Sequence, residues 1–307
     1  METSRFVIEC VPNFSEGREV KVVDAIEAAI TGVPGTILLN RTSDWDHNRS
    51  VFTFAGCTEA VLDAAVAAAA TSAKLINLNG HRGVHPRVGA LDVLPFVPLS
   101  GSTINDCVEL AHRAGQRIWD ELGIPVYFYQ AAALRADRVR LEDVRRGQFE
   151  ALREQVATEA AKRPDIGGPM LHPTAGAVIV GARKVLIAFN INLRSNDLEF
   201  AQVVAKRIRT SSGGLPEVKA LGLRLRTRGL VQVSMNLTDF EVTPPLAVYA
   251  EVSRLCEQQG IDIEESELIG LAPEKAINEA TAVQLKLSHF NPLLTIEGRI
   301  LANRPAR

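Results

Sequence analysis

The sequence predicts a mixed α+β protein that folds as two subdomains. At 307 residues, 46% of them hydrophobic, the chain is long enough to bury two cores. Strand-like and helix-like hydrophobic patterns follow one another in the order β-α-β-β-α-β in each half. This order is the split βαβ, or ferredoxin-like, arrangement, an α/β sandwich in which helices cover one face of a largely antiparallel sheet. We expect the subdomains at residues 1–175 and 176–307 with a cleft between them; one continuous, doubly wound α/β sheet is the alternative.

In the first half, short apolar runs predict strands, and longer runs with an apolar residue at every third or fourth position predict helices. Strands are expected at residues 6–11, 36–40, 50–56, 90–99 and 125–129, and helices at 20–30, 58–76 and 103–122. Pro34-Gly35 marks the turn before the second strand, and Gly56 ends the third. Thr58 is expected to cap the alanine-rich helix that follows.

A charged stretch at about 134–165 separates the two halves. It is too amphipathic for a disordered tether, so we expect it to pack as connecting structure. In the second half the same patterns predict strands at 176–182, 185–193, 218–226, 230–238 and 267–273, and helices at about 197–210 and 246–259 and from residue 273 onward. Thr243-Pro244 is the expected start of the helix at 246–259.

Composition excludes several classes of partner. A formal net charge of -2 gives no sign of nucleic-acid binding. The four cysteines form no C-x-x-C pair, which favours buried free thiols in a reducing compartment. The N-terminus has no apolar segment of signal-peptide length, and no run reaches the roughly 18 apolar residues that a bilayer span requires. We expect a cytoplasmic protein with neither a nucleic-acid nor a membrane partner.

A segment with distinctive chemistry, HRGVHPRVGALDV, occupies residues 81–93. Its glycines allow backbone conformations that other residues avoid, while Pro86 fixes one φ angle, so we expect a shaped loop. His85 supplies a group that gains or loses a proton near neutral pH, and Arg87 and Asp92 add charges of both signs. The segment is therefore a candidate catalytic loop. A surface loop whose histidine ring stacks on a neighbour is the alternative.

A second polar segment, DWDHNR, lies at residues 44–49 between two expected strands. Aspartate and asparagine favour turns, which is the simpler interpretation. A metal site is the alternative, but no helical H-x-x-x-H pattern supports it, and we expect no metal. The ligands of such a site would be Asp44, Asp46, His47 and His81.

A loop rich in glycine and proline, residues 167–176, precedes the expected strand at 176–182. Such a loop can bring backbone N–H groups close to a flat or anionic ligand, and Arg183 adds a positive charge beyond the strand. It has neither the G-K-[ST] of a phosphate-binding loop nor a G-x-G-x-x-G pattern. A crossover that needs glycine only to turn is the alternative.

Together these segments resemble the formiminotransferase family, also called glutamate formimidoyltransferases. The similar segments are ECVPNFSEGR, DHNRSVFTFAG, HPRVGALDVLPFVPL, GPMLHPTAGAVIVGARKVLIAFNINL and QVSMNLTDFEVTP, spread from residue 9 to about 244. The resemblance implies two α/β subdomains, a homodimer, and transfer of a formimino group from N-formimino-L-glutamate to tetrahydrofolate, a step of histidine degradation. It indicates a monofunctional member: the mammalian enzyme continues into a cyclodeaminase, whereas this sequence stops at Arg307, so we expect cyclodeaminase activity to come from another protein.

The resemblance also implies roles for particular residues. The family's catalytic histidine belongs to a G-x-H-P-R-x-G-A motif and corresponds to His85. Its folate-contacting loop corresponds to Gly168, Pro169, Met170, Leu171, His172, Pro173, Thr174, Ala175 and Gly176. The mammalian enzyme differs from this sequence in the segment at residues 44–48 and has an aromatic residue where this loop has Ala175.

The substrates implied by the resemblance carry carboxylates and an amidine. Arg49, Arg87 and Arg183 are candidates for the carboxylates, because a guanidinium fork matches a carboxylate at two points. Asp92 is a candidate for orienting His85 or holding the protonated amidine. Three other functions stay open: formyl transfer between 5-formyltetrahydrofolate and glutamate, folate binding without turnover, and metal-dependent hydrolysis.

Overall fold

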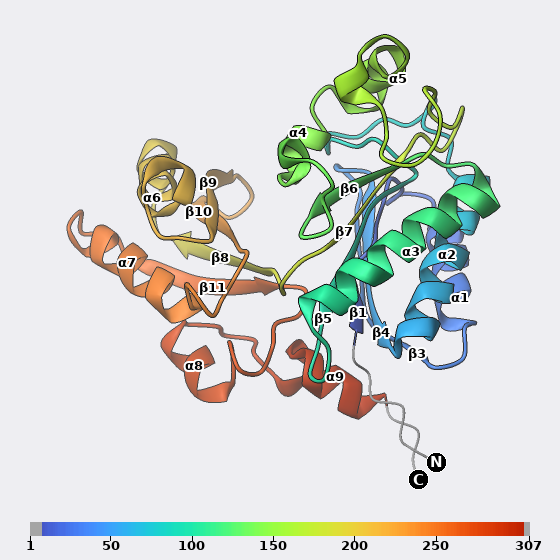
Figure 1. The fold of residues 1–307 in the computed structure, drawn as a ribbon. Coiled ribbons are helices and arrows are strands. Elements are labelled where there is room, and N and C mark those ends of the chain that lie inside the picture. Colours follow the sequence, from blue (N-terminus) through green and yellow to red (C-terminus); the bar gives the residue numbers. More distant parts are fainter. Residues whose placement is uncertain (1–7, 304–307) are drawn as a thin grey trace. The chain divides into compact units, whose positions relative to one another are not determined.

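The computed structural model describes residues 8–303. The chain divides into two compact units, Met1–Arg183 and Lys184–Arg307, and each unit contains one sheet with helices packed on it (Figure 1). The prediction of a mixed α+β protein with two sheets is confirmed. Residues 6 and 7 of the first expected strand lie outside the described residues.

A seven-stranded sheet forms the first unit. Its strands are β1 (Ile8–Cys10), β2 (Asn13–Phe14), β3 (Thr36–Asp44), β4 (Arg49–Gly56), β5 (Leu91–Pro98), β6 (Val126–Gln130) and β7 (Val178–Ala182). β1 and β2 act as one interrupted strand between β4 and β5, and β3 lies beyond β4. These pairings are antiparallel and follow the split βαβ order, while β7 and then β6 extend the sheet in parallel.

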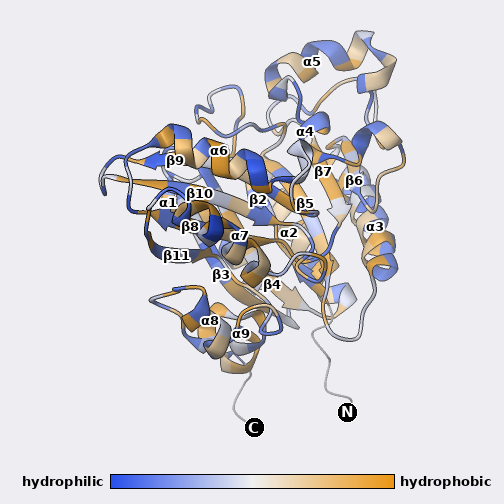
Figure 2. Cartoon of the chain, turned by 90° about the vertical axis from the view of Figure 1, so that its left-hand side faces the viewer, coloured by the Kyte–Doolittle hydropathy of each residue, from blue (hydrophilic) through white to orange (hydrophobic). Residues whose placement is uncertain are grey.

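Three helices pack on this sheet: α1 (Val20–Thr31), α2 (Thr58–Leu75) and α3 (Ile104–Leu122). α2 is hydrophobic over most of its surface because it contacts α1, α3 and the sheet (Figure 2). α3 has well-defined ends, since Thr103 forms a capping box with Asp106 and Gly123 closes the helix in the left-handed region. The expected cap of α2 is wrong by one residue: Cys57 holds the N-cap position, without a side-chain hydrogen bond.

The charged stretch between β6 and β7 packs on the first unit, as expected. It contains α4 (Leu141–Val144), α5 (Gln148–Thr158) and two 3-10 turns, η1 (Ala136–Arg138) and η2 (Ala160–Lys162). A buried ion pair anchors it: Arg138 and Asp165 lie 2.5 Å apart, with side chains only 4% and 5% exposed. Asp165 also accepts the N–H of Phe128 in β6 at 2.8 Å. The stretch is therefore attached to the sheet through β6.

The strand at residues 176–182, expected to open the second subdomain, belongs to the first unit. As β7 it lies between β5 and β6, and all five of its residues are buried. A strand that is apolar on both faces suits the interior of a parallel arrangement. Its hydrophobicity alone does not show to which of the two sheets the strand belongs. The structure divides the chain after Arg183 rather than after residue 175.

The second unit has the split βαβ order without additions to its sheet. Its elements are β8 (Ile187–Leu193), α6 (Leu198–Ile208), η3 (Thr210–Ser212), β9 (Val218–Leu225), β10 (Leu230–Leu237), α7 (Pro245–Glu257) and β11 (Ile263–Ile269). The sheet order is β11-β8-β10-β9, and every pairing is antiparallel. This arrangement is the ferredoxin-like one.

Two expectations near the C-terminus are wrong. The last strand is β11 at Ile263–Ile269, earlier than the expected 267–273. In place of one helix from residue 273 there are two short helices, α8 (Glu279–Gln284) and α9 (Ile296–Ala302), with the turn η4 (Pro292–Leu294) between them. Asn278 and Thr295 cap these helices, so the helices begin later than the periodicity indicates.

The start of α7 agrees with the sequence. α7 begins at Pro245, directly after the expected Thr243-Pro244 pair.

The state of the cysteines and the hydrophobicity of the helices agree largely with what the composition predicts. All four cysteines are free; Cys10, Cys107 and Cys256 are buried and Cys57 is half-buried. Within residues 8–303, no helix combines the length and hydrophobicity needed to cross a bilayer.

Candidate active site

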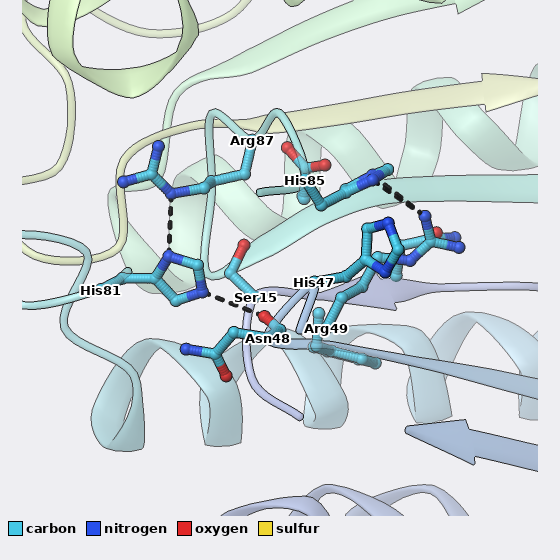
Figure 3. Close-up of a pocket in the computed structure, with 10 residues that line it drawn as sticks. Ser15, His47, Asn48, Arg49, His81, His85 and Arg87 are labelled. Atoms are coloured by element: carbon cyan, nitrogen blue, oxygen red, sulfur yellow. Dashed lines mark hydrogen bonds between the residues drawn. The ribbon is translucent and has the colours of Figure 1, made fainter. Parts of the chain in front are cut away.

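Three strands of the first unit bring polar loops together at one end of the sheet. Phe14 at the end of β2 pairs with Ser50 near the start of β4 and with Leu91 at the start of β5, so the segments flanking these residues meet. A narrow pocket lies here (Figure 3). Its polar lining consists of Asn13, Ser15, His47, Asn48, Arg49, His81, His85, Arg87 and Asp92. The two polar segments singled out in the sequence, 44–49 and 81–93, are therefore neighbours.

His85 is half-buried and contacts Arg49. The Nη1 atom of Arg49 lies 3.0 Å from Nε2 and 3.3 Å from Nδ1 of the imidazole. Because a guanidinium only donates hydrogen bonds, the ring must accept, which requires the neutral form. Burial, followed by the charges of Arg49 and Arg145, lowers the pKa of His85 from 6.5 to about 3. His85 is thus a neutral base throughout the physiological pH range.

His81, the second histidine of the same loop, is fixed on both sides. Its Nδ1 accepts from Arg87 Nε at 3.0 Å, and its Nε2 lies 3.0 Å from the carbonyl oxygen of Asn48. These partners require the neutral tautomer with the proton on Nε2. With 7% exposure, His81 joins the loop at 81–93 to the turn at 44–49.

The alternative metal site has no support in this geometry. Both ring nitrogens of His81 are bonded, and no group of three or more histidine, cysteine, aspartate or glutamate side chains is placed to hold a metal within residues 8–303.

Arg87 was a candidate for a substrate carboxylate, but its guanidinium is already paired. Nη2 and Nη1 donate to the two carboxylate oxygens of Glu150 at 2.6 and 3.0 Å, and Nε donates to His81. Glu150 lies in the first turn of α5, so this pair holds the loop at 81–93 against the charged stretch. With 6% exposure, Arg87 is placed to shape the loop.

Asp92 is also committed to protein partners. One carboxylate oxygen accepts the N–H of Val88 at 2.7 Å, and the other accepts from Arg145. No hydrogen bond joins Asp92 to His85 among the residues that the structure describes, so the expected direct orientation of His85 by Asp92 is not seen. Asp92 instead holds Arg145 beside the pocket.

Arg145 is a residue that sequence reasoning missed. It follows α4 in the charged stretch, where many arginines alternate with carboxylates and no pattern distinguishes one of them. Its charge is one of the causes that lower the pKa values of His85 and Arg49. Its Nε atom is buried without a hydrogen-bond partner in the described part of the chain. After burial, the charges of Arg49 and Arg145 are therefore what keeps His85 neutral.

The segment at residues 44–49 forms the β3–β4 turn, in agreement with the simpler interpretation. Asp44 accepts the backbone N–H of His47 at 2.7 Å and contacts its Nδ1 at 2.9 Å. Asn48 takes a positive φ of 48° and bonds Gly17 and Arg82. The His47 ring then lies edge-on to His85, with 6.0 Å between ring centroids (Figure 3).

The loop at residues 168–176 ends beside the candidate catalytic loop. Ala90 donates to the carbonyl oxygen of Ala175 at 2.9 Å, and Ala177 donates to that of Val88 at 3.0 Å. Gly176 has a φ of 72°, and a Cβ on it would lie 2.2 Å from the Val88 oxygen, so this glycine is required for packing.

Arg183 lies elsewhere in the first unit. It follows β7, donates its N–H to Phe96 near the end of β5 and does not line this pocket. Because β5 and β7 are parallel, the backbones of Arg183 and Asp92 are separated by roughly 15 Å. Three of the four expected substrate residues therefore line this pocket, and Arg183 does not.

A neutral histidine beside two arginines, in an α+β scaffold, gives this pocket a proton acceptor among positive charges, as expected in an enzyme that acts on anionic substrates. Residues 7–183 match the N-terminal subdomain of the formiminotransferase domain, and residues 188–292 match the formiminotransferase domain. The chain belongs to the formiminotransferase domain family, which confirms the resemblance seen in its motifs.

Relatives resemble the chain along most of its length. It is 40% identical over 285 residues to a glutamate formimidoyltransferase of Streptococcus pyogenes serotype M1, covering 93% of this chain and 95% of that one. A glutamate formimidoyltransferase of Thermoplasma acidophilum is 42% identical over 300 residues, with 97% of each chain covered. The formimidoyltransferase-cyclodeaminase of Rattus norvegicus is 43% identical over 282 residues, covering 90% of this chain and 52% of that protein.

Proposed function

We propose that this protein is a glutamate formimidoyltransferase of histidine degradation. It transfers the formimino group of N-formimino-L-glutamate to N5 of tetrahydrofolate and yields 5-formiminotetrahydrofolate and L-glutamate. The similarity to two glutamate formimidoyltransferases along more than nine-tenths of the chain supports this reaction. The observation that carries it in the structure is the neutral His85 held against Arg49.

His85 serves as the general base. N5 of tetrahydrofolate attacks the amidine carbon and must lose its proton, which a neutral imidazole accepts. The amidine carbon is attacked directly, so no covalent enzyme intermediate is needed. Proton transfer by a positioned side chain contributes about 10²–10⁴ in rate, and holding both substrates together adds a further share.

Arg49 receives a substrate carboxylate, and the charge of Arg145, which is paired with Asp92, adds to the attraction. Two of the expected arginines line this pocket. Among the described residues, Arg87 is paired with a carboxylate and Arg49 is not. A bound carboxylate would partly neutralise the two guanidinium charges and so raise the pKa of His85 toward the range useful for a base. Substrate binding and activation of the base are thereby coupled.

Tetrahydrofolate, the co-substrate, binds along residues 168–176. Within the second part of this loop the N–H groups of His172, Ala175 and Gly176 are bonded inside the loop. The first part is open: Met170 is 73% exposed, and a Cβ on Gly168 would meet nothing within 4 Å. Residues 168–170 therefore offer the flat pterin a more accessible backbone than the turn that follows.

The remaining parts of the proposal come from the family resemblance. The protein acts in the cytoplasm as a homodimer and binds formiminoglutamate and folate as its small-molecule partners, without a metal. Elemental analysis of the purified protein tests the metal alternative, since stoichiometric zinc, manganese or iron would support a metal-dependent hydrolase.

The direct test is a pair of reactions with the purified protein. Formiminoglutamate with tetrahydrofolate is expected to give 5-formiminotetrahydrofolate and free glutamate without added metal or nucleotide. 5-Formyltetrahydrofolate with glutamate is expected to react more slowly. The cationic amidine of formiminoglutamate gains up to about 1 kcal/mol from a carboxylate such as Asp44 or Asp46, which the neutral formyl group does not. Faster formyl transfer would move the protein to the formyl reaction, and folate binding without either reaction would make it a folate-binding protein.

Replacing Gly168 by valine tests the folate-binding segment. Because the added side chain meets open space at this position, the melting temperature is expected to change little. Affinity for tetrahydrofolate is expected to fall at least tenfold if the pterin lies against this backbone, since a Cβ branch blocks close approach. Isothermal titration measures the affinity. Unchanged affinity in a folded variant would show that this segment only turns the chain.

A further inference from the structure

The His47 side chain, in the turn between β3 and β4, has no part in the reaction as described so far. The reaction needs a proton donor as well as a base, because the glutamate nitrogen must gain a proton as it leaves. His85 begins neutral, since Arg49 donates to its ring. It could return to the glutamate nitrogen the proton that it takes from N5, whereas a separate donor would have to be a second group.

Most titratable side chains facing His85 are already engaged. His81 has both ring nitrogens bonded, and Asp92 has both carboxylate oxygens bonded. Arg49 and Arg145 do not release protons near neutral pH. His47 differs: its Nδ1 contacts Asp44 at 2.9 Å, and no hydrogen bond engages its Nε2 among residues 8–303.

Three features of His47 suit a proton donor. Its ring lies edge-on to His85, with 6.0 Å between centroids, on the opposite side of the pocket from His81 and Arg87 (Figure 3). The Asp44 carboxylate contacts Nδ1, so Nε2 is the ring nitrogen that can face a substrate. The side chain is 49% exposed, so it can regain a proton from water after each turnover.

We propose that His47, held by Asp44, is the general acid that protonates the departing glutamate nitrogen, while His85 acts only as the base. This inference rests on the proposed transferase reaction. The two imidazoles lie side by side; the His85 ring contacts a guanidinium group, and the His47 ring contacts a carboxylate.

The step balances as follows. The N5 lone pair forms the bond to the amidine carbon, and the π pair of the amidinium moves to its terminal nitrogen. His85 takes the proton from N5, and His47 gives one to the glutamate nitrogen through Nε2. The carbon–nitrogen bond to glutamate then breaks with its electron pair on that nitrogen, while the terminal nitrogen restores the double bond. His85 releases its proton to water and His47 takes one up.

Three single variants of this turn test the inference with formiminoglutamate and tetrahydrofolate. His47→Asn is expected to lower kcat by about 100-fold with the KM for tetrahydrofolate nearly unchanged. Asp44→Asn keeps an oxygen for the backbone N–H of His47 but removes the charge, and is expected to lower kcat by about tenfold. Asp46→Asn, the matched control, makes the same charge change in the same turn without touching the imidazole and leaves kcat unchanged.

Added imidazole separates catalysis from turn structure. Because His47 is half exposed, free imidazole is expected to restore at least a tenth of the wild-type kcat to His47→Ala and nothing to wild type. A His47→Asn variant with kcat within twofold of wild type would overturn the inference in favour of His85 as both base and acid. Loss of activity without imidazole rescue would assign His47 to the turn alone and also overturn it. Wild-type protein that fails to transfer the formimino group would instead overturn the proposed function.

Discussion

Replacing His85 by asparagine is expected to lower kcat by about 100-fold or more, with folate binding largely kept. Asparagine can still accept from Arg49 but cannot take a proton from N5 of tetrahydrofolate, so the loss falls on the chemical step. Steady-state kinetics with formiminoglutamate, together with titration of tetrahydrofolate, measure the two quantities separately. His289→Asn, an exposed histidine of the second unit, serves as the control and retains wild-type kcat. Near-normal turnover in His85→Asn would remove His85 from the mechanism.

The neutral state of His85 has a consequence for stability that does not depend on substrates. Its pKa is about 3 in the folded protein and near its ordinary value in the unfolded chain, so protons bind preferentially to the unfolded state between these values. The resulting stabilisation is present above about pH 6.5 and is lost as the pH falls toward 3. Between pH 7 and pH 5 the melting temperature of the wild type should therefore fall further than that of His85→Asn. Parallel decreases would show that His85 is not held neutral.

Replacing Asp165 by alanine is expected to destabilise the protein by about 3–5 kcal/mol, the usual cost of leaving one member of a buried ion pair uncompensated. Arg138 and Asp165 are almost fully buried, and Asp165 also accepts the N–H of Phe128. The pair anchors the stretch that carries Arg145 and Glu150 to the site. Chemical denaturation measures the change in unfolding free energy.

An exposed ion pair close by provides the control for this prediction. Arg135 and Asp137 pair in the same stretch with side chains 39% and 56% exposed. Asp137→Ala is expected to cost less than about 1 kcal/mol, because solvent screens the interaction. Equal effects of the two substitutions would show that the Arg138–Asp165 pair does not anchor the stretch.

Local sequence patterns were sufficient for most of the secondary structure. Alternating and helical spacings depend on residues close together in the chain, so elements such as α2, β5 and the split βαβ order of the second unit could be predicted. The errors lie where side-chain capping or strand partners decide. Asn278 and Thr295 delay the last helices, and the neighbours of β7 determine its sheet.

The same division holds at the candidate active site. Motifs such as that around His85 were enough to indicate the family and an acid–base group in a shaped loop. The folded structure was needed to show that Arg87 pairs with Glu150, that Arg145 reaches Asp92, and that His47 lies against His85. These contacts join residues 38 to 63 positions apart. Charge and hydrogen bonding act through space, so the neutral state of His85 follows from where the chain brings its arginines and not from their spacing along it.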